Sequence, residues 1–436
     1  MHRRQDATVN CNDVLESHGD SVRRKQNLNR ERRDVIVIGA GPSGSIAGAL
    51  LRRRGWDVLV LEGQKFPRFS IGESLLAHCL DFVAEAGMIE AVDAAGFQFK
   101  NGAAFIRGDE YGDFDFGDKF TPGRNSTYQV QRAAFDKLLA DEAEKQGVEI
   151  RYETRVVAVD NAAAAPRVSA KDAAGREYTV QGRFILDASG FARTLPRLLD
   201  LEIPSTFPVR NAVFTHVADR VPDGAFDRNK IQVVVHPVHH DVWYWLIPFP
   251  NGRCSLGCVA RKDFFAAYPA ALDERLKQLV GEEPFLSSLL AAAEWDTPIR
   301  ELSGYAANVK AMHGPGFALL GNAAEFLDPV FSSGVTIAMR SASMASEVLD
   351  RQLRGERVDW TTQFERPLRT GVDTFRAYVR AWYDGRFQDI MFSKANAPEI
   401  RRMICAILAG YAWDESNPFV SDPERRLDMV AKLCAN

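Results

Sequence analysis

Three glycines near the start of the chain have the spacing G-x-G-x-x-G, at Gly39, Gly41 and Gly44. In such a loop the first glycine allows a tight turn, the second lets a pyrophosphate approach the backbone, and the third lets strand and helix pack closely. The phosphates would lie at the N-terminus of the next helix, where unpaired N–H groups favour anions. Glu62 directly follows the next apolar run, where its carboxylate is placed to accept hydrogen bonds from the ribose hydroxyls of an adenosine. These residues predict a dinucleotide-binding site.

The elements that must hold this loop are also visible in the sequence. Val35–Ile38 are all β-branched, which is typical of a strand buried on both faces of a parallel sheet, and Val58–Leu61 is a second run of apolar residues that predicts a strand. The Ala- and Leu-rich stretch up to Arg54 predicts the helix between them, ended by Gly55. The order strand, glycine turn, helix, strand and acid favours a nucleotide site over a purely structural turn.

Further along the chain, the sequence predicts a helix over Leu75–Ala86. Beyond this helix the hydrophobic pattern changes twice. Between residues 209 and 259, short strand-like runs separated by Pro, Gly and Asp predict an antiparallel sheet. After Arg351 the sequence is typical of helices. We therefore expect a mixed α/β (α+β) fold. We divide it into a dinucleotide-binding domain over residues 34–200 and 300–350, a sheet domain over 201–299, a helical cap over 351–436, and a disordered arm over 1–33.

The composition excludes several classes of protein. A formal net charge of −4, from 54 basic and 58 acidic residues, gives no electrostatic basis for binding nucleic acid. The six cysteines are irregularly spaced, which argues against a disulfide framework and against a metal site. No stretch approaches the ~20 apolar residues that cross a bilayer, and the first 33 residues lack the apolar centre of a signal peptide. We expect a cytoplasmic protein without a metal centre that binds neither nucleic acid nor a membrane.

Three later segments favour FAD as the dinucleotide. Gln131–Asp136, Asp187–Gly190 and Gly321–Ala324 resemble the later motifs of the FAD-dependent oxidoreductases related to the aromatic hydroxylases. The resemblance implies a Rossmann-like FAD-binding domain of the aromatic-hydroxylase type, with Arg132 along the flavin and Asn322 near the ribityl chain and pyrophosphate. That superfamily usually has Asp at the position of Asn322. An amide can still hydrogen-bond a hydroxyl, but it lacks the charge.

Three other segments resemble one branch of that superfamily, the flavin-dependent halogenases. They are Phe66–Leu76, Trp243–Pro248 and Asp328–Val335, and the second matches the signature W-x-W-x-I-P in full. The resemblance implies that reduced FAD (FADH2), oxygen and chloride or bromide give hypohalous acid in a compartment kept apart from the organic substrate. It places the sheet domain and the helical cap on the side of that substrate.

The resemblance also implies roles for individual residues. Trp243 and Trp245 would face one side of a strand and separate flavin from substrate, although two core aromatics would have the same spacing. Ser333 and Gly334 would bind the halide through N–H groups at a helix start, an arrangement that an ordinary helix cap shares. Lys100 would relay the halogen, either by donating a hydrogen bond to hypohalous acid or as a haloamine. The second route requires burial to lower its pKa, whereas most lysines are solvated.

Residues of the glycine loop, the acid after it and the motif segments make up the expected FAD site. They are Gly39, Gly41, Pro42, Ser43, Gly44, Glu62, Arg68, Ile71, Gly72, Glu73, Ser74, Arg132, Asp187, Gly190, Asn322 and Pro329.

Phe331 occupies the position at which tryptophan-type halogenases have a glutamate before the halide segment. This departure resembles the pyrrole and phenol subclass, many members of which act on substrates held by an acyl carrier protein. We therefore expect a free phenol or pyrrole, or a carrier-bound aromatic acyl group, as substrate. Because the sequence has no separate nicotinamide motif, a second protein, a flavin reductase, should supply FADH2. An acidic carrier would suit a basic surface, although a solvated helix face explains the same residues: Arg366, Arg369, Arg376, Arg380, Arg401 and Arg402.

Several alternatives stay open. An FAD-dependent aromatic monooxygenase or a reductase like the geranylgeranyl reductases would share the dinucleotide segments but would need neither Lys100 nor the two tryptophans. A non-catalytic flavoprotein would bind FAD without turnover. A histidine could deprotonate the substrate, and nothing in the sequence favours one of His216, His236, His239 and His240.

Overall fold

The run Val35–Ile38 forms strand β2 of a six-stranded sheet in the computed structural model, which describes residues 30–161, 165–393 and 397–434. The strand order is β20-β21-β12-β2-β3-β8, and all neighbours are parallel except β20 and β21. The bounds of the other strands are β3 (Val58–Leu61), β8 (Glu149–Arg151), β12 (Phe184–Asp187), β20 (His313–Gly314) and β21 (Phe317–Leu319). All side chains of β2 and β3 are buried, as a strand covered on both faces requires.

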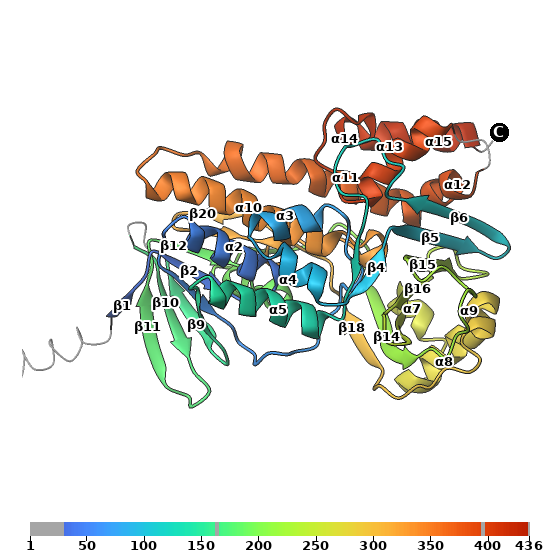
Figure 1. Cartoon of the computed structure of the whole chain (residues 1–436), viewed down its shortest axis with the longest axis horizontal. Helices are drawn as coiled ribbons and strands as arrows, with labels where there is room; N and C mark the ends of the chain where they lie inside the picture. The colour runs from blue at the N-terminus through green and yellow to red at the C-terminus, as the bar shows by residue number, and fades with distance from the viewer. Residues whose placement is uncertain (1–29, 162–164, 394–396, 435–436) are drawn as a thin grey trace, which may run out of the picture.

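Helix α2 (Pro42–Arg53) joins β2 to β3, so the predicted β-α-β unit is present. Every residue of α2 from Pro42 to Leu51 is buried. This helix packs between α5 (Arg132–Lys145) and α10 (Ser333–Leu353), and Figure 1 shows the three helices together. The N-terminus of α2 is thereby fixed at the carboxyl edge of the sheet.

A four-stranded sheet has the order β1-β11-β10-β9 among the described residues. Its strands are β1 (Arg30–Arg32), β9 (Arg155–Asp160), β10 (Arg167–Lys171) and β11 (Glu177–Gln181). Of the arm predicted to be disordered, residues 1–29 lie outside the described residues. Residues 30–32 are β1, which pairs in parallel with β11, so this end of the predicted arm is ordered.

The sheet predicted over residues 201–299 has seven strands within the described residues, in the order β18-β14-β17-β16-β15-β5-β6. They are β5 (Gly102–Arg107), β6 (Glu110–Asp115), β14 (Arg210–Ala218), β15 (Lys230–Val235), β16 (Trp243–Pro248), β17 (Arg253–Arg261) and β18 (Arg300–Ser303). The sheet is mixed rather than antiparallel, because β15 and β5 pair in parallel. It also extends beyond the expected range 201–299, because a strand pattern does not reveal which distant strand will be its neighbour.

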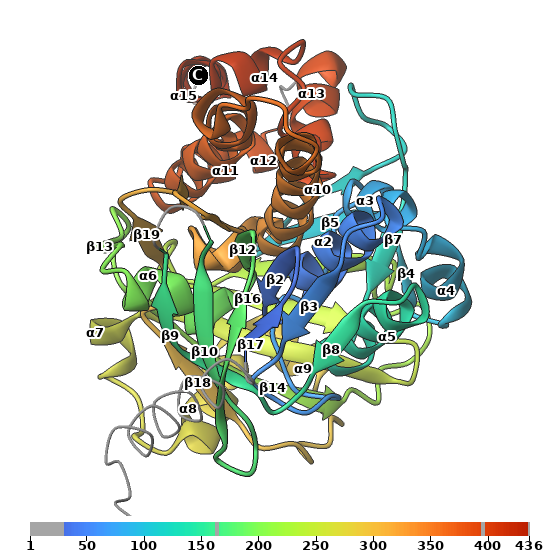
Figure 2. The same ribbon diagram turned by 90° about the vertical axis from the view of Figure 1, so that its left-hand side faces the viewer.

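The C-terminal part is helical, as predicted. Its helices are α11 (Arg366–Tyr383), α12 (Arg386–Phe392), α13 (Pro398–Leu408), α14 (Pro418–Ser421) and α15 (Pro423–Cys434). They form a layer over β5 and β6, seen in red and orange at the top of Figures 1 and 2. The helical cap therefore covers the β5–β6 edge of the seven-stranded sheet.

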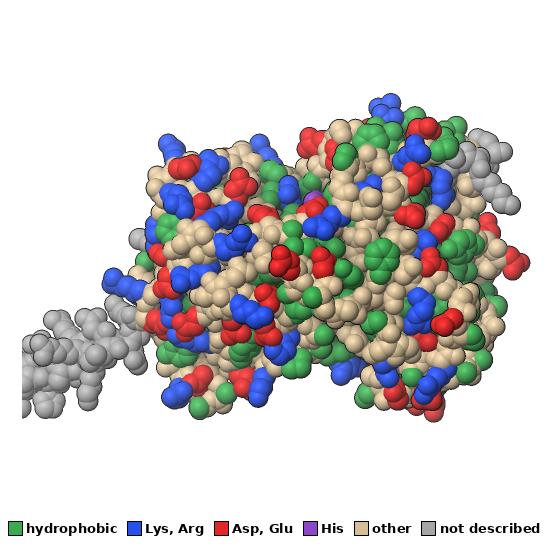
Figure 3. Space-filling view, in the orientation of Figure 1, with side chains coloured by type: hydrophobic (Ala, Val, Ile, Leu, Met, Phe, Trp, Pro, Cys, Tyr) green, Lys and Arg blue, Asp and Glu red, His purple; other side chains and the backbone are tan. Residues whose placement is uncertain are grey.

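The remaining elements connect these layers. They are α3 (Cys79–Glu85), α4 (Ile89–Ala94), β4 (Gln98–Lys100), β7 (Thr127–Gln129), α6 (Thr194–Leu198), β13 (Glu202–Pro204), α7 (Lys262–Phe265), α8 (Leu272–Glu282), α9 (Pro284–Leu289), β19 (Ala307–Val309) and the 3-10 turn η3 (Pro329–Phe331). The helix predicted from Leu75 begins four residues later, because the backbone at Ser74 and Leu75 pairs with β7 instead. No described helix is long and apolar enough to span a membrane. Acidic and basic side chains are interspersed over the face shown in Figure 3.

Candidate active site

A cavity of about 590 Å³ lies at the carboxyl ends of β2, β3 and β12 and reaches strand β16. Most of the predicted cofactor and wall residues line it: Gly39, Gly41, Pro42, Ser43, Glu62, Arg68, Ile71, Gly72, Glu73, Ser74, Arg132, Gly190, Trp243, Trp245, Asn322, Pro329 and Gly334. Gly44, Lys100, Asp187 and Ser333 are not among its lining residues. Segments far apart in the sequence thus converge on one chamber.

The glycine loop has the geometry that a pyrophosphate needs. A Cβ at Gly44 would lie 1.9 Å from the carbonyl oxygen of Gly39, so this glycine allows the close contact of helix and strand. A Cβ at Gly41 would approach only Arg68, at 3.4 Å, so Gly41 faces open space. Within the described residues no side chain caps the N-terminus of α2. Its N–H groups are therefore available to an anion in the cavity.

Glu62 is held in place by the backbone on either side of it. Its carboxylate accepts hydrogen bonds from the N–H of Ala40, at 2.8 Å, and of Gln64, at 2.9 Å. Glu62 is 6% exposed and directly follows β3, beside the glycine loop. A carboxylate in this position can accept hydrogen bonds from the hydroxyl groups of a ribose.

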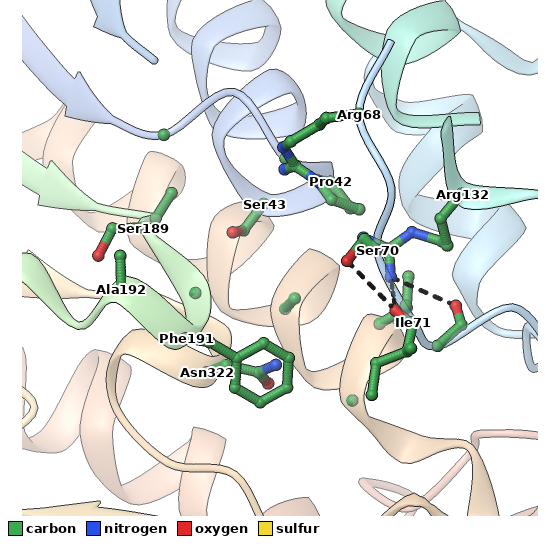
Figure 4. Close-up of a pocket in the computed structure, with 18 of the residues that line it drawn as sticks. Pro42, Ser43, Arg68, Ser70, Ile71, Arg132, Ser189, Phe191, Ala192 and Asn322 are labelled. Atoms are coloured by element: carbon green, nitrogen blue, oxygen red, sulfur yellow. Dashed lines mark hydrogen bonds between the residues drawn. The ribbon is translucent and has the colours of Figure 1, made fainter. Parts of the chain in front are cut away.

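Arg132 anchors a loop rather than projecting freely. It donates to both carboxylate oxygens of Asp136, at 2.7 and 3.0 Å, and to the carbonyl oxygens of Ile71 and Gly72. In Figure 4, Arg132 and Ile71 lie on one side of the cavity, across from Ser189 and Ala192. The arginine thereby fixes the segment that precedes Glu73.

Asp187 acts behind the cavity wall. Its buried carboxylate accepts hydrogen bonds from the N–H of Ser189, at 2.9 Å, and of Leu195, at 2.6 Å. Burial raises its pKa. The carboxylate shapes the turn Ser189–Ala192, which itself lines the cavity.

The two tryptophans of β16 lie side by side at the far end of the cavity. The ring centroids of Trp243 and Trp245 are 6.0 Å apart, and both rings line the cavity. The indole N–H of Trp245 donates to Ser255 Oγ at 2.9 Å, and its ring covers Gly257, where a Cβ would lie 2.3 Å from the ring. The indole N–H of Trp243 donates to Tyr383 Oη at 3.0 Å. Both indoles are therefore fixed in orientation.

Lys100 ends β4 and is fully buried. Its Nζ lies 2.7 Å from Ser74 Oγ and 2.7 Å from the carbonyl oxygen of Leu75. Burial lowers its pKa to about 7. A neutral amine has two N–H donors and one lone pair, so the two acceptors can satisfy both donors and leave the lone pair unused.

Lys100 faces a second, much smaller cavity of about 10 Å³. Ile231 and Ser332 line this cavity and the large one, so the two are neighbours. The small cavity has room for about one water molecule. Phe331 and Leu408 are among its lining residues, and its volume is too small to hold an aromatic ring.

The segment predicted to bind the halide, Asp328–Val335, forms a backbone turn at the start of α10. Asp328 accepts a hydrogen bond from the N–H of Val330 at 3.1 Å, and Ser332 has a left-handed conformation with φ 56°. Among the described residues no side chain caps α10, whose first residues are Ser333 and Gly334. A left-handed residue followed by a helix N-terminus turns successive N–H groups toward one point, which suits a small anion.

Sequence reasoning missed two pairings in this site. His216 Nε2 lies 2.7 Å from Glu73 Oε1. His216, one of the four histidines considered as a base, thus contacts a residue that lines the large cavity. Tyr383 links Trp243 to Asp328, with 2.9 Å between its hydroxyl and the carboxylate. No sequence signal identifies either pair, because each joins residues more than 50 positions apart.

The residues present fit FAD. The large cavity runs from an uncapped helix N-terminus beside the carboxylate of Glu62 to a wall of two indoles, and its glycine loop is open where a pyrophosphate would lie. An extended dinucleotide with an aromatic ring system matches this sequence of environments.

Comparisons with known proteins agree with this geometry. The FAD binding domain family matches residues 32–363. A pyrrole-2-carbonyl peptidyl-carrier-protein brominase of Pseudoalteromonas luteoviolacea is 30% identical over 76% of this chain and 80% of its own. The corresponding chlorinase of Pseudomonas fluorescens is 25% identical over 90% of this chain and 92% of its own.

Solved structures of flavoproteins are also similar to this chain. A protein described as a flavoprotein/dehydrogenase from Cytophaga hutchinsonii has a TM-score of 0.90 and 43% identity, covering 93% of this chain and 99% of its own. The flavin-dependent brominase Bmp2 has a TM-score of 0.80 and 27% identity, covering 92% of this chain and 100% of its own. The protein therefore belongs to the flavin-dependent halogenases, within the family that carries this FAD binding domain.

Proposed function

We propose that this enzyme halogenates an electron-rich aromatic ring, a pyrrole or a phenol, and that Lys100 transfers the halogen as a neutral amine. Bound reduced FAD would supply, with oxygen, the oxidation of chloride or bromide to hypohalous acid. The main observation behind the proposal is the position of Lys100, which is fully buried, has a pKa lowered by burial to about 7, and lies in a small cavity next to the FAD cavity.

Lys100 would react in two balanced steps. Its lone pair attacks the halogen of hypohalous acid, and an N–X bond forms while the X–O bond breaks; one amine proton leaves with the hydroxide as water. The aromatic carbon then attacks the same halogen, the N–X electron pair returns to nitrogen, and the ring proton passes to the amine. The haloamine keeps one N–H, which would donate to Ser74 Oγ or to the Leu75 carbonyl oxygen until the second step restores the other N–H.

The other residues would separate and position the reactants. The backbone turn from Ser332 to Gly334 would bind the halide beside the flavin. The indoles of Trp243 and Trp245 would keep the organic ring out of the FAD cavity. The shared lining residues Ile231 and Ser332 mark the passage for a molecule of the size of hypohalous acid.

The substrate class rests on Phe331 and on the named relatives. Phe331 lines the small cavity in place of an acid, so activation there would come from the ring itself. Relatives with 30% and 25% identity carry names that specify carrier-bound pyrroles. A ring can reach Lys100 only if lining side chains such as Phe331 move, because the small cavity has room for about one water molecule. We propose that a separate reductase delivers FADH2.

The arginines considered for carrier binding are mostly neutralised. Four of the six form ion pairs: Arg369 with Glu365, Arg376 with Glu325, Arg380 with Glu424 and Arg402 with Asp118. These ion pairs reduce the positive charge that the cap offers to an acidic carrier protein. The assay should therefore include free substrates as well as carrier-bound ones.

The test supplies the protein with chemically reduced FAD, oxygen and bromide, and with free phenols, free pyrroles and carrier-bound pyrrole acyl groups. Mass spectrometry should show a product with the isotope doublet of bromine. Lys100→Met should still oxidise FADH2 but give no brominated product, whereas Lys65→Met, a change at an exposed lysine, should behave like the wild type. Full bromination by Lys100→Met would remove this residue from the reaction.

A flavin-dependent dehydrogenase or reductase is the second candidate. It is favoured by the structure from Cytophaga hutchinsonii, at 43% identity. An oxidised or reduced organic product without bromine, in the same assay, would support this candidate and contradict halogenation.

A further inference from the structure

Three distant parts of the chain meet in one chain of partly buried hydrogen bonds. The indole N–H of Trp243, on β16, donates to the hydroxyl of Tyr383 at 3.0 Å. Tyr383, the last residue of α11, donates to Asp328 Oδ2 at 2.9 Å. Asp328 also accepts from the N–H of Val330 and so begins the halide segment. Tyr383 is thus the link between the indole wall, the halide segment and the C-terminal helices.

The two tryptophans differ in how they are held. Trp245 donates to Ser255 on the neighbouring strand, so its own sheet fixes it. Trp243 donates to a residue of the helical cap. A buried indole N–H without an acceptor is costly, so loss of the Tyr383 hydroxyl would free the Trp243 ring to reorient.

The charges around Asp328 keep this link in one arrangement. Asp328 is 4% exposed and faces Arg210 of β14, Tyr305 before β19 and Tyr383. Burial raises the pKa of Asp328 to about 6, against the opposing effect of Arg210. The guanidinium of Arg210 lies 3.3 Å above the centroid of the Tyr383 ring, which restricts the phenol as well.

We propose that Tyr383 is a positioning residue that fixes the Trp243 indole relative to the halide segment. In this position the indole would direct hypohalous acid toward Lys100 and reduce its loss. The inference deepens the proposed function and rests on it for its consequence in turnover. Tyr383 is not among the lining residues of either cavity. It acts through the indole on one side and through the carboxylate on the other.

Tyr383→Phe tests the link by removing only the hydroxyl. Tyr378→Phe is the matched control, because Tyr378 lies on the same helix and its buried hydroxyl has no hydrogen-bond partner among the described residues. We expect both variants to oxidise FADH2 at the wild-type rate. Tyr383→Phe should yield about five-fold less brominated product for each FADH2 oxidised and should have a higher KM for bromide. Equal product yield from the two variants would overturn the proposal.

The double variant with Asp328→Asn separates positioning from general loss of packing. If Tyr383 acts through Asp328, the loss in the double variant should equal that of the more severe single variant. Multiplicative losses would show that the two residues act independently and would contradict the link.

A second measurement does not depend on halogenation. The indole N–H signal of Trp243 can be followed by NMR and assigned as the one of seven that is missing in Trp243→Phe. It should shift with pH around a midpoint near 6 in the wild type and in Tyr378→Phe, and should be insensitive to pH in Tyr383→Phe. A titration unchanged in Tyr383→Phe would refute the inference, whereas absence of bromination in every variant would refute only the proposed function.

Discussion

Replacing Lys100 by methionine would measure how strongly burial disfavours the charge of this lysine. Burial lowers the pKa of Lys100 to about 7 in the folded protein, whereas a lysine in an unfolded chain titrates near ~10.4. Between these values the unfolded chain binds a proton that the folded protein lacks, so the free energy of unfolding of the wild type rises with pH. The slope is about 1.4 kcal/mol per pH unit, or about 3 kcal/mol from pH ~7.5 to ~9.5.

Urea denaturation at about pH 7.5, 8.5 and 9.5 gives the measurement. Lys100→Met has no group that titrates at this position, so its stability relative to the wild type should fall by that slope as the pH rises. The loss of the hydrogen bonds to Ser74 and Leu75 adds a cost of about 1–3 kcal/mol per unpaired group, which is independent of pH. The change with pH therefore isolates the protonation of the amine.

Lys230→Met is the matched control. Against the effect of burial, the hydrogen bond to Asp227 and the charge of Asp113 raise the pKa of Lys230. This lysine is charged in both states below about pH 9.5, so its variant should differ from the wild type by a constant amount. If Lys100→Met also differed by a constant amount, Lys100 would be charged in the folded protein, and transfer through a neutral amine would be refuted.

Three further predictions follow from the cavities. Gly44→Ala places a Cβ 1.9 Å from the Gly39 carbonyl oxygen, so thermal unfolding should show a loss of about 2–3 kcal/mol, whereas Gly41→Ala should fold normally and bind FAD more weakly in a fluorescence titration. Phe331→Ala removes a ring that packs 5.0 Å from Phe387, so it should cost about 3 kcal/mol and admit bulkier phenols, and an unchanged substrate range by mass spectrometry would contradict this. Asn322→Asp should tighten FAD binding about five-fold through a charge-assisted hydrogen bond, and an unaltered Kd would show that Asn322 does not contact the ribityl chain.

The sequence alone was sufficient for the nucleotide end of the site. The β-branched run Val35–Ile38, the spacing up to Gly44 and the acid at Glu62 are all encoded within thirty residues. Their geometry depends on short-range properties, namely side-chain branching, the freedom of glycine and the alternation of strand and helix. The structure accordingly has the strand, turn, helix and strand where they were predicted.

The strand that carries Lys100 shows where local rules fail. Phe99 is 46% exposed, whereas its charged neighbour Lys100 is 0% exposed. Hydrophobicity would assign these two side chains the opposite way. The amine is buried because Ser74 and Leu75, about 25 residues away, supply its two acceptors. Resemblance to a family identified the residue, but not the partners that make its burial tolerable.

Sequence by itself determined the local elements and the cofactor loop, and tertiary structure decided the substrate side of the site. The parallel pairing of β5 with β15, the meeting of Lys100 and Phe331 at the small cavity, and the bonds of Tyr383 to Trp243 and Asp328 all join segments that are distant along the chain. Such contacts depend on the path of the whole chain, because a hydrogen bond forms only when packing elsewhere brings donor and acceptor within about 3 Å.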